Sequence, residues 1–487
     1  MTQNGREITA KLAEEFGPDV VSMLTASQFQ DWRLDETDIT DCGIAQIVAR
    51  EHGGSIRRVL NIGEWRAFDG RVWAGGEAAT RSIERAILDV GRKLYDRAPT
   101  LPKEISKSAI RAGVRALSDA GVRAVLNRLG AVEEIGCTSA IFDQLPENLN
   151  VLNGTVCLRT GRLRPHRRED FLTSLIELEF HPALVPTRWI RFLSEIFEPN
   201  PELVDYLHRA IGYASCGMVA EHVFHLLIGT GRNGKTVFVE TLASVLGDYA
   251  LAIAADTLAR THDLQRPRPD IALMRNKRMV FSQEANRGTQ FDEALIKKLT
   301  GGDTISARLL HSNPINFKST GKLLLSTNHA PEITGTESAI WRRMRLIPFK
   351  VSFAGREDVS LSKKLEGERE GILAWVVEGA QKYFASGLEA PPVVTSATDE
   401  YRRQSDQLGR FLEDCVEFID GATVPASRLQ GAYKAWAING GESPQRDAVV
   451  AEYLAAKGIQ KKHGRAGKTY YGISLRPIQM EDENDTV

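Results

Sequence analysis

Gly229-Thr230-Gly231-Arg232-Asn233-Gly234-Lys235-Thr236 matches the G-x-x-x-x-G-K-[ST] pattern of a phosphate-binding loop. An apolar run typical of a buried parallel strand, residues 223–228, leads into it, and a helical pattern, residues 237–246, follows it. In such a loop the backbone N–H groups surround the phosphates, Lys235 reaches the outer phosphates and Thr236 offers its hydroxyl to Mg²⁺. A glycine-rich turn that matched by chance would not have strand, loop and helix in register. The pattern therefore predicts an α/β fold, a parallel sheet flanked by helices, that binds ATP with Mg²⁺.

Two further strand-like runs follow the loop, and each ends in a polar side chain. Residues 278–283 lead to Glu284, and residues 322–327 lead to Asn328. A carboxylate at such a strand end polarises the attacking water and approaches the metal, so Glu284 is the expected catalytic acid and a Mg²⁺ ligand beside Thr236. Asn328 is expected to orient the water or to sense the γ-phosphate. Many such strands end in two acids, but Gln283 precedes Glu284 here, so Thr236, phosphates and water would hold most of the metal.

A hairpin is predicted between these two strands. Strand-like runs at residues 304–310 and 315–318 flank His311-Ser312-Asn313-Pro314, whose residue types favour a tight turn. Hydrolysis alone does not need a hairpin here, and Arg308, His311 and Lys318 suit the phosphates of DNA. The alternative is an ordinary surface hairpin whose polar side chains face solvent and do not contact DNA.

An arginine cluster precedes the last strand-like run. Arg342, Arg343 and Arg345 come before Leu346-Ile347-Pro348-Phe349, and we expect Arg345 to alternate with Arg343 along one strand. Such clusters usually face solvent or nucleic acid, but arginine also stabilises transition-state charge when a neighbouring subunit supplies it.

These motifs, in this order, resemble the helicase part of the phage and plasmid primase–helicases related to the poxvirus primase–helicase. Those proteins are superfamily 3 helicases with a AAA+ core. The resemblance rests on residues 229–236, on Glu284, on the K-x-L-T-G-G-D…A-R segment of residues 297–308, on the strand ending in Asn328, and on Arg343 in an R-R-x-x-x-I-P-F run.

The resemblance implies a replicative DNA helicase of a phage, plasmid or other mobile element. Such an enzyme is an ATP hydrolase that forms a homo-oligomeric, hexameric ring and moves 3′-to-5′ on single-stranded or forked DNA. Its catalytic residues would be Lys235, Glu284, Asn328 and Arg343. Arg343 would act as a finger in the neighbour's site, with Arg342 as the runner-up because one step of register exchanges them.

The chain divides into four segments by pattern. Residues 1–195 read as a mixed α+β and helical region, residues 196–392 as the AAA+ domain, residues 393–478 as a winged helix, and residues 479–487 as an acidic disordered tail. In the first segment Trp65 and Trp73 flank an Asp69-Gly70 turn, and we interpret that hairpin as core packing.

The winged helix is predicted from helices at residues 401–419, 426–438 and 446–457 and a closing hairpin at residues 459–475. Its basic residues suit DNA, although many winged helices serve only as protein contacts. The candidates are Lys461, Lys462, Arg465 and Lys468.

Length and composition limit the remaining functions. Only about 40 residues precede the part that resembles the family, fewer than the roughly 100 that a primase fold needs, so we do not expect primer synthesis in this chain. A separate primase or origin-binding protein, or no partner at all, would supply it. The formal charge of −1 confines DNA affinity to local patches. The five cysteines contain no C-x-x-C pair, and no signal peptide or membrane-length apolar run occurs, which predicts a reducing cytosol and no membrane contact. The resemblance to phage and plasmid proteins implies that this is the cytosol of a bacterial host. Two alternatives stay open: a AAA+ ATPase that remodels or recruits proteins at a DNA origin without unwinding, and a P-loop kinase-type NTPase.

Overall fold

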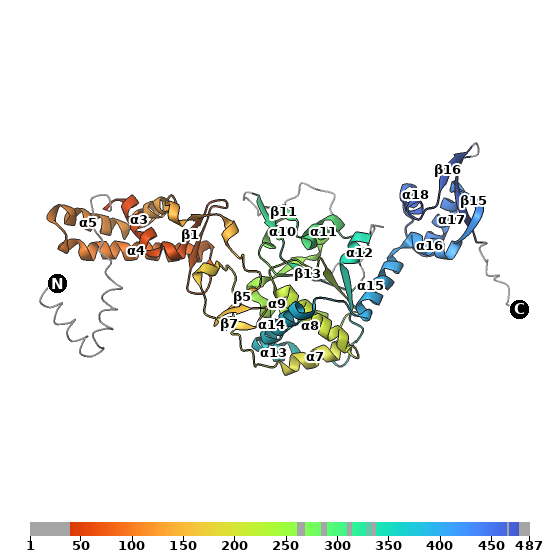
Figure 1. Ribbon diagram of the computed structural model, residues 1–487, viewed down its shortest axis with the longest axis horizontal. Coiled ribbons are helices and arrows are strands. Elements are labelled where there is room, and N and C mark those ends of the chain that lie inside the picture. The colour runs from red at the N-terminus through yellow and green to blue at the C-terminus, as the bar shows by residue number, and fades with distance from the viewer. Residues whose placement is uncertain are drawn as a thin grey trace. The chain divides into compact units, whose positions relative to one another are not determined.

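The computed structural model describes residues 39–260, 268–283, 290–308, 314–328, 331, 333, 338–464 and 467–476. Contacts divide the chain into two compact units, Met1–Phe142 and Asp143–Val487, which are described separately (Figure 1). The sequence-based domain boundaries remain predictions. Among the described residues, no helix is both long enough and apolar enough to cross a membrane.

The first unit packs helices against a small sheet of strand order β3-β2-β1-β4. Trp73 is fully buried and its ring lies near those of Phe68 and Phe142, in agreement with core packing, and Trp65 is half-buried. Thr40 begins the first helix by accepting a hydrogen bond from the backbone N–H of Gly43. Its elements are α3 (Asp41–His52), β1 (Ile56–Val59), β2 (Glu64–Phe68), β3 (Trp73–Ala74), α4 (Gly76–Arg97), α5 (Lys103–Ala116), α6 (Asp119–Leu129) and β4 (Gly136–Cys137).

The second unit contains a mixed α/β core around five parallel strands in the order β14-β8-β13-β10-β9. The strands are β8 (Phe224–Ile228), β9 (Ala250–Ala254), β10 (Met279–Gln283), β13 (Lys322–Thr327) and β14 (Met344–Pro348). Every residue of β13 is buried because this strand lies in the middle of the sheet with both faces covered. The strands predicted at residues 223–228, 278–283 and 322–327 are confirmed.

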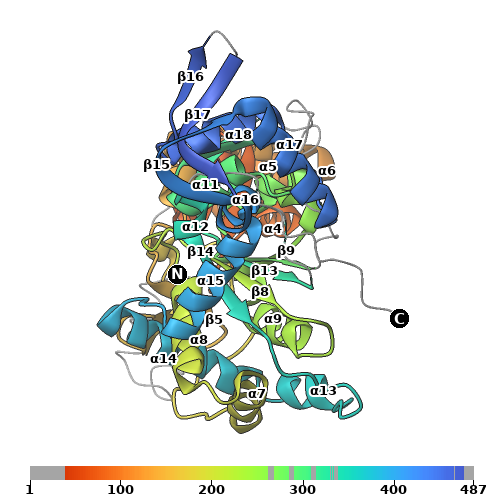
Figure 2. The same ribbon diagram turned by 90° about the vertical axis from the view of Figure 1, so that its right-hand side faces the viewer.

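Helices cover both faces of this sheet, as Figure 2 shows. Alternate residues of β13 point to opposite faces: Leu324 packs into the core formed with α7, α8, α9 and α14, while Leu323 and Leu325 pack into the core formed with α10, α11 and α12. The bounds are α7 (Thr187–Phe197), α8 (Pro201–Ser215), α9 (Lys235–Leu246), α10 (Pro269–Leu273), α11 (Glu293–Gly301), α12 (Ser338–Arg343), α13 (Leu361–Glu366) and α14 (Arg369–Ser386).

Two smaller sheets flank the core. The strands β5 (Asn148–Val151), β6 (Gly154–Cys157) and β7 (Arg162–Arg164) form an antiparallel sheet, and β11 (Thr304–Ala307) pairs with β12 (Ile315–Lys318). The hairpin predicted between the second and third strands is therefore confirmed in its two strands.

Two buried basic side chains tie α8 to the amino-terminal edge of the large sheet. Arg278, just before β10, donates to the carbonyl of Ser215 over 2.8 Å, and Lys322, the first residue of β13, donates to the carbonyls of Cys216 and Met218. These carbonyls lie at the carboxyl end of α8, where helix carbonyls lack internal partners and carry partial negative charge. The two side chains give these carbonyls hydrogen-bond partners.

The C-terminal elements depart from the prediction at one helix. Residues 401–419 do not form one helix: α15 (Pro392–Ser405) ends, α16 (Gln407–Cys415) begins under an Asp406 cap, and Val416–Pro425 form strand β15. The side chain of Asp406 accepts from the N–H of Gly409, which starts a new helix, and β15 then pairs with the last strand. The later helices and the hairpin are confirmed as α17 (Ala426–Asn439), α18 (Asp447–Ala456), β16 (Lys461–Gly464) and β17 (Gly467–Leu475).

Candidate functional site

The loop between β8 and α9 has a backbone that requires glycine. Gly234 has φ +85°, and a Cβ on Gly229 would lie 2.3 Å from the carbonyl oxygen of Phe349. The backbone N–H of Phe353 donates to the carbonyl of Arg232 over 2.8 Å, and this bond holds the outer part of the loop. The loop leads directly into α9. At the amino terminus of a helix, backbone N–H groups and the helix dipole favour anions.

The ammonium of Lys235 lies in the middle of this loop and is almost fully buried, with 4 % of the residue exposed. It donates to the carbonyl of Gly229, to Oδ1 of Asn233 over 3.2 Å and to Oδ1 of Asn328 over 3.0 Å. Thr236, the next residue, is exposed. The structure thus brings together Lys235 and Asn328, two predicted site residues that lie far apart in the chain.

The strand order explains this meeting. In a parallel sheet the carboxyl ends of all strands lie at one edge, and β13 is the immediate neighbour of β8. On the far side of β13 lies β10, which ends at Gln283. Glu284, the predicted catalytic acid, lies outside the described residues, as does the side chain of Gln283.

Arg343 lies at the opposite edge of the same sheet. It is the last residue of α12 and directly precedes β14, whose Met344 pairs with Phe224 at the start of β8. The length of β8, about 16 Å at ~3.3 Å per residue, separates this edge from the loop. The expectation that Arg343 alternates with Arg345 along a strand is wrong, because the helix continues through Arg343. Arg345 instead donates to the carbonyls of Arg342 and Met344.

The predicted DNA-facing residues of the hairpin are partly described. Lys318 pairs with Thr304 at the base of the β11–β12 hairpin, and Arg308 follows Ala307 at its distal end. Both side chains are exposed, and His311 lies outside the described residues. The described cations of this hairpin therefore face solvent.

The basic residues of the β16–β17 hairpin are exposed as well. Lys461, Lys462 and Lys468 are exposed, and Arg465 lies outside the described residues. The ammonium of Lys462 lies 5.1 Å from the ring centroid of Tyr471, a cation–π distance. Lys461 lies at the same distance from Tyr470.

A buried histidine lies on the strand that carries the loop. His225 of β8 is fully buried, and its Nε2 lies 2.9 Å from the hydroxyl of Tyr206. Burial, with a contribution from the neighbouring positive charge of Arg345, lowers the pKa of His225 to about 3. His225 therefore stays neutral at physiological pH.

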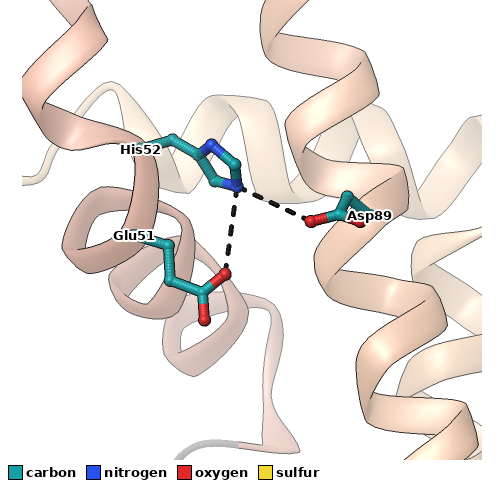
Figure 3. Close-up of side chains that lie close together, drawn as sticks. All are labelled: Glu51, His52 and Asp89. Atoms are coloured by element: carbon teal, nitrogen blue, oxygen red, sulfur yellow. Dashed lines mark ion pairs between the residues drawn. The ribbon is translucent and has the colours of Figure 1, made fainter. Parts of the chain in front are cut away.

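One cluster of possible metal ligands occurs among the described residues, in the first unit. Figure 3 shows Nε2 of His52 facing the carboxylates of Glu51 and Asp89, at 3.9 and 3.8 Å. Lys93 pairs with both carboxylates, at 3.1 and 2.7 Å, and the hydrogen bond to Asp89 raises the pKa of Lys93. The carboxylates already have a cation, so we assign this cluster to the packing of α3 against α4.

Two contacts of the predicted site residues were not foreseen from the sequence. The carbonyl of Phe349 accepts from Nδ2 of Asn233, and it acts through the backbone, which leaves no residue-type signal. Thr300 accepts a hydrogen bond from Arg343 over 3.2 Å. No sequence signal marks this contact, because it depends on the packing of α12 against α11.

Comparisons with known proteins agree with this architecture. Residues 45–198 match the family described as "D5 N terminal like", and residues 227–343 match a family of unknown function, DUF5906. The chain is 29 % identical over 248 residues to the "Putative helicase L207/L206" of Acanthamoeba polyphaga mimivirus, covering 47 % of this chain and 26 % of that protein. It is 25 % identical over 322 residues to the "Putative primase C962R" of African swine fever virus (isolate Warthog/Namibia/Wart80/1980), covering 61 % of this chain and 34 % of that protein.

The chain therefore spans about a quarter to a third of the length of these curated relatives. Among solved structures, the A form apo structure of the NrS-1 C-terminal region has the same fold, with a TM-score of 0.50 and 11 % identity. That match covers 90 % of this chain and 100 % of the solved chain.

Proposed function

Because this chain belongs to the primase–helicase-like family of these viral proteins, we propose that it is an ATP-driven DNA helicase. The observation that carries the proposal is the 3.0 Å contact between the ammonium of Lys235 and the amide of Asn328 at the carboxyl edge of the sheet. A loop lysine and a polar residue on the neighbouring strand meet where the phosphates of a nucleotide would bind.

The residues present fit ATP with Mg²⁺. The loop offers backbone N–H groups at the start of α9, a buried ammonium and the exposed hydroxyl of Thr236, which suits an anion and its counter-ion. Residues 229–236 would cradle the phosphates, and Thr236 with Glu284 would hold the metal. When bound, Mg²⁺ supplies charge neutralisation on the phosphate oxygens.

Hydrolysis then needs a positioned water and charge stabilisation. Glu284 would draw a proton from the water, and the amide of Asn328 would orient that water while its oxygen keeps Lys235 in place. Lys235 would stabilise the charge that develops on the outer phosphates.

A further cation is needed opposite the outer phosphate, and the fold suggests where it comes from. Arg343 lies at the far edge of its own sheet, about 16 Å from its own loop by strand length, so it serves a neighbouring molecule better than itself. We therefore propose a AAA+ core that assembles as a ring, a hexamer as in superfamily 3, with Arg343 as the finger. Arg342, which is exposed, is the alternative.

DNA would contact the β11–β12 hairpin. Its exposed Arg308 and Lys318 can neutralise backbone phosphates without reading sequence. Helix α16, strand β15, helices α17 and α18 and the β16–β17 hairpin have the order of a winged helix, and Lys461, Lys462 and Lys468 give it a basic wing that can add to DNA affinity.

The test is a strand-displacement assay on forked DNA with ATP, beside an ATPase assay with and without single-stranded DNA. The wild-type protein should separate the strands, and the Lys235→Ala variant should lose both activities. Forks with only a 3′ or a 5′ single-stranded arm would report the direction of movement. DNA-stimulated hydrolysis without strand separation would instead favour a protein-remodelling ATPase, and no hydrolysis at all would reject the proposal.

A further inference from the structure

The hydroxyl of Thr300 joins Arg343 to the last turns of α11, the helix that leads into the β11–β12 hairpin. Thr300 is 3 % exposed, and its Oγ1 accepts from the guanidinium of Arg343 over 3.2 Å while donating to the carbonyl of Ile296 over 2.7 Å. A buried hydroxyl with one donor and one acceptor partner is satisfied on both sides. Any movement of the Arg343 guanidinium away from Thr300 leaves Oγ1 without its donor.

Thr300 stands directly before Gly301-Gly302, which leads into the hairpin. Helix α11 ends at Gly301, and Gly302 follows with φ +75°, a conformation that glycine adopts readily. Strand β11 begins at Thr304, two residues later. Thr300 therefore lies where α11 leads into the first strand of the hairpin.

A third segment, which contains His222, contacts Thr300. The carbonyl of Thr300 lies 3.0 Å from Nδ1 of His222, and since a carbonyl only accepts, this ring nitrogen donates. His222 comes two residues before β8, the strand that carries the phosphate-binding loop. The amino-terminal edge of the sheet thus gathers the arginine, the hairpin base and the entry to the loop strand around Thr300.

We propose that Thr300 is a positioning residue that couples nucleotide at the subunit interface to DNA at the hairpin, an inference that rests on the proposed function. When Arg343 turns toward a neighbour's phosphate, it releases Thr300, and the end of α11 and the β11–β12 hairpin change their preferred position. By linkage, DNA that fixes the hairpin changes the affinity for nucleotide by the same factor.

The test measures this coupling without hydrolysis. The dissociation constant of a fluorescein-labelled oligo(dT) is measured for the full chain with and without the non-hydrolysable β,γ-imido analogue of ATP. For the wild type we expect the ratio of the two constants to differ from one by about fivefold or more. In Thr300→Val, which keeps the shape but loses the hydroxyl, the ratio should fall to about one, while the KM for ATP is retained because residues 229–236 are untouched.

Two variants control for folding and for general loss of a hydroxyl. Thr300→Ser keeps the hydroxyl and should retain the ratio. Thr398→Val removes a buried hydroxyl of matched geometry, which donates to the carbonyl of Val394 over 2.7 Å and accepts from the backbone N–H of Leu346. It does not touch Arg343, so its ratio should equal that of the wild type.

The possible outcomes distinguish a failure of the coupling role of Thr300 from a failure of the proposed function. A wild-type ratio in Thr300→Val, or equal losses in Thr300→Val and Thr398→Val, would overturn the coupling role while leaving the helicase intact. Additional loss when Thr300→Val is combined with Arg343→Ala would also overturn it, because Thr300 is argued to act through Arg343. A wild-type protein that neither binds oligo(dT) nor hydrolyses ATP would overturn the proposed function itself.

Discussion

The ammonium nitrogen of Lys235 lies 3.0 Å from the amide oxygen of Asn328, although 93 positions separate the two residues in the chain. The contact exists because β13 inserts beside β8, so the residue after one strand meets the loop after the other. Asn328 is a neutral acceptor, and it orients the lysine without neutralising its charge. This contact holds the ammonium at the edge of the sheet where phosphates are expected.

Asn328→Ala should separate binding from turnover. Lys235 retains the carbonyl of Gly229 and the amide of Asn233, so nucleotide affinity should change by less than about threefold, whereas kcat should fall by about 10² because the water loses its orienting group. Equilibrium binding of a fluorescent ATP analogue and steady-state ATPase measure the two quantities. Loss of nucleotide affinity equal to the loss of kcat would assign Asn328 a purely binding role.

Glu284→Gln should bind ATP and fail to hydrolyse it. The amide cannot accept a proton from water, while the loop at residues 229–236 is unchanged, so a drop in kcat of about 10² or more is expected at constant affinity. Gln283→Ala is the matched control, because it changes the neighbouring residue without removing a carboxylate. Near-normal turnover in Glu284→Gln would show that another group activates the water.

Arg343→Ala should be rescued by mixing. Alone, the variant should bind ATP normally and lose about 10³ in kcat, the range by which arginine fingers accelerate hydrolysis. Mixed with Lys235→Ala protein it should regain activity, since the intact loop of one subunit then faces the intact arginine of the other. An inactive mixture would place Arg343 in a structural role. Arg342→Ala, tested in the same mixing experiment, would show whether Arg342 is the finger instead.

Arg308→Ala combined with Lys318→Ala should uncouple hydrolysis from DNA. Basal ATPase should persist, while stimulation by single-stranded DNA and strand separation fall. The logarithm of the DNA affinity should depend less steeply on the logarithm of salt concentration, by about 0.7 for each phosphate of a single strand that the protein no longer neutralises. Arg111→Ala, an exposed arginine on α5, serves as the control. If single-stranded DNA still stimulated the ATPase of the double variant fully, the hairpin would have no role in coupling hydrolysis to DNA.

Acid should destabilise the protein through His225. Its pKa is lowered to about 3 in the folded state, against about 6.5 in an unfolded chain, so between these values the unfolded state binds one more proton. The free energy of unfolding should then fall as pH falls below about 6.5, by at most about 1.4 kcal/mol per pH unit for this group.

His225→Gln, which keeps a polar partner for Tyr206 but does not titrate, should show a shallower slope between pH 6 and pH 5. Denaturant unfolding at several pH values measures it. Identical slopes in both proteins would mean that His225 is protonated in the folded state as readily as in the unfolded one.

The sequence was most informative where one local pattern decided the structure. Apolar runs bounded by glycine or polar residues located β8, β10, β12 and β13, and the loop pattern located Lys235 at the start of α9.

Features that depend on distant partners could not be read in this way. Residues 416–419 were predicted as the end of a helix because the strand character of Val416–Pro425 comes from pairing with β17, which lies about 50 residues on. Arg343 looked like part of a strand because the boundary between α12 and β14 is set by packing against α11 and β8. The hydrogen bond of Arg343 to Thr300 needed the fold itself, since no sequence spacing relates the two.

The strand order also has a consequence for how the chain is made. Strand β8 lies between β13 and β14, and both are translated after it, so a nascent chain that ends before Lys322 contains the phosphate-binding loop without the strands beside it. The carbonyl that holds Asn233 belongs to Phe349 itself. A growing polypeptide on the ribosome would thus acquire nucleotide affinity late and in one step, when the last strand leaves the exit tunnel. Ribosome-bound chains stalled before and after that strand should differ sharply in their retention of ATP.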